Sequence, residues 1–129
     1  MSHFTTIQTQ IRDLDALNHA CVEMQLELLA NTPVRGYGGV TRHAFRTIKL
    51  KGRYDIAVDH SEENDGSYGL TTDWWDGLVA LEVGVGSGRL LQSYGVHKTL
   101  REARNRGLRA TRKVEPNGSI LLTLEGASL

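Results

Sequence analysis

The chain has 129 residues, of which 40% are hydrophobic, and its 15 Lys and Arg balance 15 Asp and Glu to a net charge of zero. A chain of this length and composition buries a core without disulfides, and the lone Cys21 excludes an internal disulfide or a metal site with two cysteine ligands. The zero net charge disfavours a dedicated nucleic-acid binder, and no apolar run approaches the ~20 residues of a membrane span.

The first third of the chain predicts a strand followed by an amphipathic helix. Thr and Ile alternate within residues 3–11, which is the period of a half-buried strand. Asp13 then stands where a helix N-cap belongs, and apolar residues recur every three or four positions from Leu14 to Leu28. We expect a helix of about four turns. Pro33 should end it, because proline disfavours helical geometry in the residue before it.

The middle of the chain predicts three antiparallel strands. After a glycine-rich connection at 34–39, apolar and polar residues alternate within three segments, which are residues 40–50, 54–58 and 68–74. An acidic loop at 61–66 joins the last two. Trp74 and Trp75 end the third strand, where their rings should point to opposite faces. One ring then belongs to the core, and the other is either covered by the next segment or exposed.

The last part of the chain predicts a second helix and a hairpin. A short helical turn and a loop are expected over residues 78–88, and the helix should run from Arg89 to about Arg106, bent near Gly95. The turn at 115–118 contains Pro and Gly at positions that favour a hairpin between residues 108–114 and 119–124.

The predicted order of elements is β-α-β-β-β-α-β-β. This order is typical of an α+β fold with a mainly antiparallel sheet and two helices on one face. No linker or internal repeat divides the chain, so we expect a single α+β domain over residues 1–129. The polar N-terminus has no apolar signal segment, which leads us to expect a cytoplasmic location.

Charge is segregated along the sequence. Residues 54–88 carry eight carboxylates and no Lys or Arg, whereas residues 89–113 carry eight Lys or Arg and one carboxylate. On a helical wheel several basic side chains of the second helix share one flank, and a further arginine follows on the next strand. This predicted basic ridge consists of His97, Lys98, Arg101, Arg104 and Arg109.

We interpret the basic ridge as a binding surface for an acidic protein partner, with Trp75 as an interface anchor. Three alternatives remain open: a solvated face, pairing with the chain's own acidic segment, or pairing with the acidic segment of a second copy in a homo-oligomer. Nucleic acid is the disfavoured partner, because Tyr94 is the only aromatic residue after position 76 and base stacking is therefore unsupported.

A glycine-rich segment before the second helix is the second candidate site. Ser87, Gly88 and Arg89 could form an anion or phosphate nest at the helix N-terminus, near Tyr94 and His97. The chain would then be a small-ligand binding protein or an enzyme. The spacing matches neither GxGxxG nor the P-loop, so a flexible connection is the competing interpretation.

The sequence identifies no catalytic residue, no cofactor and no metal site. None of the five histidines forms an HxH, HxxxH or HExxH spacing, although distant histidines could converge with Asp55 or Asp59. Cys21 lies on the apolar stripe of the first helix, where a buried structural cysteine is the ordinary interpretation. We therefore favour a non-enzymatic protein.

Ordered motifs near both ends carry a family resemblance. They are Met1-Ser2-His3-Phe4, Ile7-x-Thr9-x-Ile11, Leu14, Leu17, Val34-Arg35-Gly36-Tyr37, Tyr94-x-x-His97 and Glu115-x-Asn117-Gly118-Ser119-Ile120. In these motifs the chain resembles the uncharacterised family named hypothetical chloroplast reading frame thirty-five, which is found in plastids, cyanobacteria and other bacteria. The resemblance implies a small soluble intracellular protein and supplies no activity, ligand or catalytic residue.

Overall fold

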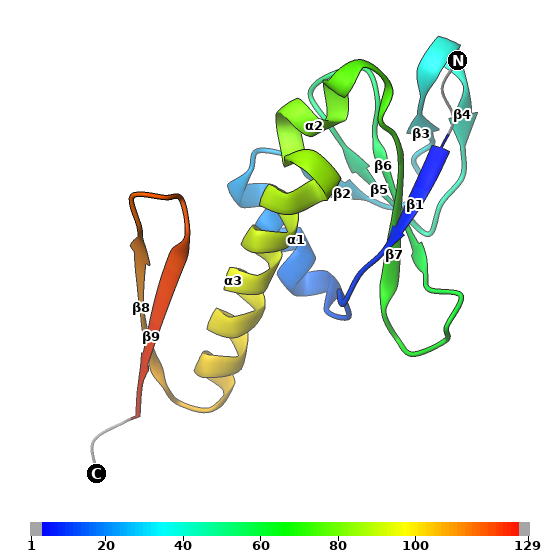
Figure 1. The fold of residues 1–129 in the computed structure, drawn as a ribbon. Coiled ribbons are helices and arrows are strands. Elements are labelled where there is room, and N and C mark those ends of the chain that lie inside the picture. Colours follow the sequence, from blue (N-terminus) through cyan, green and yellow to red (C-terminus); the bar gives the residue numbers. More distant parts are fainter. Residues whose placement is uncertain (1–3, 127–129) are drawn as a thin grey trace.

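The computed structural model describes residues 4–126 and has an α+β fold, in which helices pack on one face of an antiparallel sheet (Figure 1). The five strands of this sheet follow the order β1-β7-β6-β5-β2. Their bounds are Phe4–Gln8 (β1), Glu27–Leu29 (β2), Arg46–Lys49 (β5), Ile56–His60 (β6) and Tyr68–Asp73 (β7). The α-helices are α1 (Leu14–Glu23), α2 (Leu78–Val83) and α3 (Gly88–Asn105). The fold class predicted from the sequence is confirmed.

The core lies between the helices and one face of the sheet. Side chains at alternate positions of the strands meet apolar side chains from all three helices. Among those with almost no exposed surface are Ile48, Ile56 and Leu70 from the sheet and Leu17, Val79, Val83 and Leu90 from the helices. Each fully buried side chain of this size contributes about 1.5–3 kcal/mol, so this layer supplies most of the driving force for folding.

A small hairpin lies against the opposite face of the sheet. It consists of β3 (Val34–Arg35), a 3-10 turn (Tyr37–Gly39) and β4 (Thr41–Arg42). Three aspartates at alternate positions of the sheet hold it. The carboxylate of Asp55 binds Arg35, that of Asp59 binds Arg42, and that of Asp73 accepts the Tyr37 N–H. Three members of the acidic segment therefore fasten this hairpin to the sheet.

The first helix is shorter than the sequence predicts, which is a correction to the expected four turns. It begins as expected after Asp13, whose side chain accepts the Ala16 N–H, but it ends at Glu23. Gln25 adopts a φ of 61°, and the Leu26 N–H binds the Cys21 carbonyl at 2.8 Å. This is a Schellman end, after which residues 27–29 leave the helix direction and pair with β5. The apolar period continues past the helix because Leu28 of β2 also packs against the core.

Three further expectations need correction. The strand predicted over residues 40–50 is divided into β4 and β5, which belong to different sheets, and the Asp59 carboxylate accepts the Phe45 N–H between them. The helix α3 runs without interruption through Gly95. The C-terminal hairpin of β8 (Arg109–Val114) and β9 (Ile120–Glu125) has the predicted turn but forms a separate two-stranded sheet beside α3 (Figure 1).

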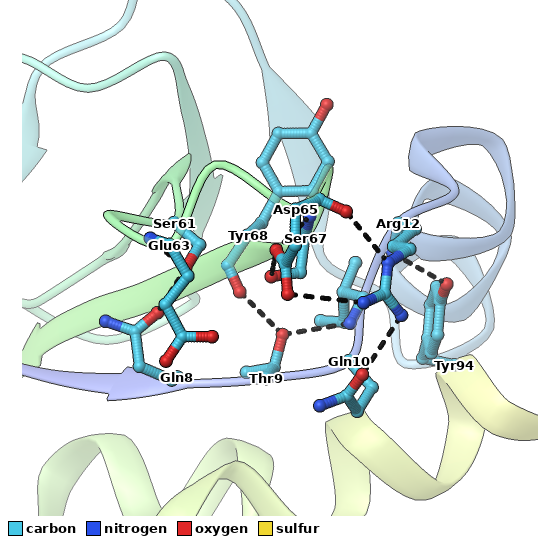
Figure 2. A network of polar contacts seen from close by, with 11 residues as sticks. Gln8, Thr9, Gln10, Arg12, Ser61, Glu63, Asp65, Ser67, Tyr68 and Tyr94 are labelled. Carbon is cyan, nitrogen blue, oxygen red and sulfur yellow. Dashed lines mark hydrogen bonds and ion pairs between the residues drawn. The ribbon is translucent and has the colours of Figure 1, made fainter.

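A polar network joins the start of α1 to the acidic loop and to α3. Figure 2 shows Arg12 reaching Asp65, with its Nη2 3.3 Å from the Asp65 Oδ2. The Tyr94 hydroxyl of α3 accepts the backbone N–H groups of Arg12 at 3.1 Å and Asp13 at 3.2 Å. The Thr9 hydroxyl donates to the Tyr68 carbonyl and so connects the segment between β1 and α1 to β7. These bonds fix the position of α3 relative to α1.

We predict that Asp55→Ala lowers the free energy of unfolding by about 3 kcal/mol, because it leaves Arg35 without its buried partner. Urea unfolding followed by circular dichroism measures this change. The matched control is Asp15→Ala, which removes an ion pair whose aspartate is 72% exposed and should cost less than about 1 kcal/mol. Equal losses in the two variants would contradict the central role of Asp55.

Candidate functional site

The predicted basic ridge lies along α3, and much of its charge is paired with α1. The Arg101 guanidinium lies 2.8 Å from the Asp15 carboxylate and 3.5 Å from that of Asp13. The Lys98 ammonium lies 3.6 Å from Asp13 and 3.3 Å from Glu102. The structure therefore brings Lys98 and Arg101 together, but it balances their charge within the chain.

Glu23 at the end of α1 contacts His97, a further residue of the ridge, and the neighbouring Arg112. Its carboxylate accepts hydrogen bonds from Arg112 at 2.6 and 3.1 Å and from Ser93 at 3.1 Å, and it lies 3.3 Å from the His97 ring. The hydrogen bond from Arg112 is the main reason that the pKa of Glu23 falls to about 2. The His97 ring also stacks on His19, with 5.8 Å between the ring centroids.

A hollow of about 460 Å³ lies between these elements. Its lining contains four basic or titratable side chains and no carboxylate. We call it the basic hollow, and its residues are His19, His97, Leu100, Arg101, Arg104 and Asn105. Arg104 is exposed and forms no ion pair or side-chain hydrogen bond with another described residue. The cavity can therefore accept an anionic group at Arg104.

The structure unites part of the predicted site and adds residues to it. His97, Arg101 and Arg104 share the basic hollow, while Lys98 and Arg109 are not part of its lining. Arg109 is exposed on β8. Sequence reasoning missed His19 and Asn105. The helical period could have indicated His19, because it lies on α1 opposite the buried Ala16, Leu17 and Ala20 stripe.

The acidic and basic segments do not pair with each other among the described residues. The arginine partners of Asp55, Asp59 and Asp65 are Arg35, Arg42 and Arg12, all from the first third of the chain. The basic segment pairs with α1 instead, and with its own Glu102. The charge segregation seen in the sequence therefore resolves into two independent sets of contacts.

Of the three residues of the predicted nest at the start of α3, Arg89 is engaged by a contact within the chain. The Arg89 guanidinium donates to the Leu81 carbonyl at the end of α2. Ser87 is fully buried, has a φ of 62°, and its side chain makes no cap hydrogen bond. Gly88 is the first residue of α3. These contacts give Arg89 a role in joining α2 to α3.

Trp75 lines a different cavity of about 1040 Å³ between the 35–41 segment and α2. It follows β7 in a 3-10 turn and is 42% exposed, whereas Trp74 packs against the core. One ring belongs to the core, as predicted, and of the two alternatives left open for the other ring the structure has the exposed one. Neither tryptophan ends the strand as expected, because β7 stops at Asp73. This cavity and the basic hollow share no lining residue, so Trp75 and the ridge do not form one pocket.

The described part of the chain also bears on three other features, which are a metal site, the reactivity of Cys21 and a membrane-spanning helix. Within residues 4–126 no group of three or more His, Cys, Asp and Glu is arranged to hold a metal ion. Cys21 is completely buried, and burial raises the pKa of its thiol to about 12. No helix of residues 4–126 is both long and apolar enough to span a membrane.

Comparison with known proteins places the chain among uncharacterised relatives. A family model described as "Protein of unknown function (DUF1257)" matches residues 16–123. The chain is 30% identical to the "Uncharacterized protein ycf35" of Pyropia yezoensis, over 97% of each chain. It is 29% identical to the protein of the same name from Guillardia theta, also over 97% of each chain. No solved structure matches it. The family resemblance inferred from the sequence motifs is confirmed.

We predict that Glu23 makes stability depend on pH. Its pKa is about 2 in the folded protein against an ordinary value of 4.5, so its stabilising effect is complete above pH 4.5 and is lost as pH falls through about 2. Glu23→Gln should therefore lower the melting temperature at pH 7, and the difference from wild type should vanish near pH 2. Circular dichroism melts measure it, with the exposed Glu62→Gln as control. A constant difference across this range would contradict the assignment.

Proposed function

The chain belongs to the DUF1257 family of proteins of unknown function, and we propose that it is a non-enzymatic interaction protein that binds an acidic segment of a partner protein in the basic hollow. The observation that carries this proposal is the lining of the hollow, which combines two arginines and two histidines with no carboxylate. An acidic side chain placed there would meet Arg104, whose charge no described residue balances. The cytoplasmic location expected from the sequence is part of this proposal.

The paired residues of the ridge support the site by holding its shape. Asp13 and Asp15 fix the Arg101 side chain, and Glu23 fixes His97. A side chain that is already ordered loses less conformational entropy when it binds. In this proposal Arg101 and His97 form the wall of the site, Arg104 supplies the free charge, and the exposed Arg109 extends the positive surface towards β8.

A second copy of the chain is the competing acidic partner. Glu62 and Glu63 in the acidic loop are exposed, and their side chains form no ion pair with described residues. They could enter the basic hollow of another molecule and produce a homo-oligomer. Asp65, the third carboxylate of the acidic loop at 61–66, is already paired with Arg12, so within this loop the alternative depends on those two glutamates.

We predict that Arg104→Glu weakens binding of an acidic partner by about tenfold or more, because it reverses the one free charge of the hollow. A fluorescent hexaglutamate peptide followed by anisotropy is the probe, and affinity capture from native extract identifies the natural partner. Binding should also weaken as salt rises towards ~0.15 M. The control is Arg53→Glu, an equal charge change at an exposed arginine outside the basic hollow. Equal effects of the two variants would contradict the proposed site.

Light scattering separates the two acidic partners. A monomer at low salt and high concentration is expected if the partner is another protein. An oligomer that dissociates in Glu62→Lys/Glu63→Lys, while Asp65→Lys leaves it assembled, would instead assign the hollow to a second copy.

A further inference from the structure

The cavity that contains Trp75 concentrates apolar side chains that folding leaves exposed. Among the described residues, ten large apolar side chains are exposed, and four of them line this one cavity. These four are Tyr37, Val40, Trp75 and Leu81. An exposed apolar surface that is gathered in one hollow is typical of a binding site. We call this hollow the aromatic cavity, because Tyr54 also lines it.

One buried carboxylate positions two of the three aromatic residues. Asp73 is 2% exposed, and its two oxygens accept the backbone N–H of Tyr37 at 3.1 Å and of Trp75 at 3.0 Å. The Tyr37 and Trp75 rings lie 5.3 Å apart between centroids and meet at 68°. Two rings at this angle form adjoining walls, and their backbones are fixed before any ligand arrives.

The turn at the rim of the cavity also has a defined shape. Gly38 and Gly39 follow Tyr37 with φ values of 69° and 80°, which other residues rarely adopt. The chain can therefore reverse direction directly after the Tyr37 ring. No side chain is added at these two positions, and a Cβ at either would meet no atom within 4 Å, so the rim is open.

The charges around the cavity favour a positively charged ligand. Arg35 lines it, but the buried Asp55 carboxylate balances that charge through two hydrogen bonds of 2.8 Å. The remaining lining charges are one arginine, Arg53, against two carboxylates, Asp76 and Glu82. The pKa of Tyr54 is raised mainly by burial, and the negative charge of Asp73 is the next cause.

We propose that the aromatic cavity binds an organic cation, in which an ammonium group with an apolar body lies against the faces of Trp75 and Tyr37. Aromatic faces attract such cations, with tryptophan the strongest. The volume of about 1040 Å³ is at the upper end of small-molecule sites, so it holds the apolar body as well as the charged group. Asp76 at the rim adds attraction, whereas Arg53 opposes it.

Nitrogen-15 NMR of the two tryptophan indole N–H groups tests this proposal, with benzyltrimethylammonium as the cationic probe and benzenesulfonate as its anionic counterpart. The cation should shift the Trp75 signal saturably and leave the Trp74 signal in place, since Trp74 packs against the core. The same concentration of sodium chloride controls for ionic strength. No saturable shift with the cation, or a larger one with benzenesulfonate, overturns the proposal.

Variants then test the role of each residue in the full chain. Trp75→Ala should weaken cation binding by about tenfold, and Trp75→Phe should weaken it less, because phenylalanine retains an aromatic face. Asp76→Asn should weaken binding about threefold and Arg53→Gln should strengthen it about threefold, since each changes one nearby charge. Arg104→Gln in the basic hollow is the matched control and should have no effect. Weaker cation binding in Arg53→Gln, or unchanged binding in Trp75→Ala, overturns the proposal.

The source of the cation is a further outcome of the same titration. If benzyltrimethylammonium binds more tightly than the tripeptide Ala-Lys-Ala, the cavity serves a free small molecule. The reverse order assigns it to a lysine side chain of a partner protein. Both orders uphold a cation site.

Discussion

The ion pair between the buried Asp55 and the partly exposed Arg35 is the contact on which the arrangement of the sheet and its polar face depends. The Asp55 side chain is 2% exposed and accepts hydrogen bonds from the Arg35 backbone and guanidinium and from the Leu50 N–H. The same guanidinium binds the Leu50 and Gly52 carbonyls. A buried carboxylate is tolerated only when its charge and its lone pairs are satisfied in this way. The pair thus fixes the 34–42 hairpin against the turn before β6, and with it one wall of the aromatic cavity.

The charge segregation of the sequence has its origin in this construction. Asp55, Asp59 and Asp73 face the small hairpin at alternate positions of two strands, where they act as attachment points rather than as a surface for partners. The basic residues Lys98 and Arg101 of α3 and Arg112 of β8 pair with carboxylates at the N-cap and within α1, which are Asp13, Asp15 and Glu23. A block of like charge in a sequence therefore does not by itself mark a charged surface. Only the charged residues that remain unpaired after folding, such as Arg104, identify a charged surface.

Periodicity predicted the elements whose signal is local. The N-cap at Asp13, the helix ending near Arg106 and the turn at 115–118 depend on neighbouring residues, and the structure contains all three. The short strand β2 was missed because its apolar residues continue the helical period, while the pairing with β5 that defines it is not local. For the site, the helical wheel brought His97, Arg101 and Arg104 together. It could not identify His19 or the aromatic cavity, whose walls come from segments nearly forty residues apart.

The zero net charge of the whole chain does not describe the local charge at either of the two hollows. The basic hollow has no carboxylate in its lining, whereas the aromatic cavity has two carboxylates against one unbalanced arginine. The chain therefore presents local potentials of opposite sign at sites with no residue in common. Exposed charges interact weakly beyond a Debye length of about 8 Å at physiological salt, so the net charge of the molecule has little influence on either site. In the two proposals one neutral protein binds an anionic and a cationic ligand, each selected by the few charges that folding leaves unpaired.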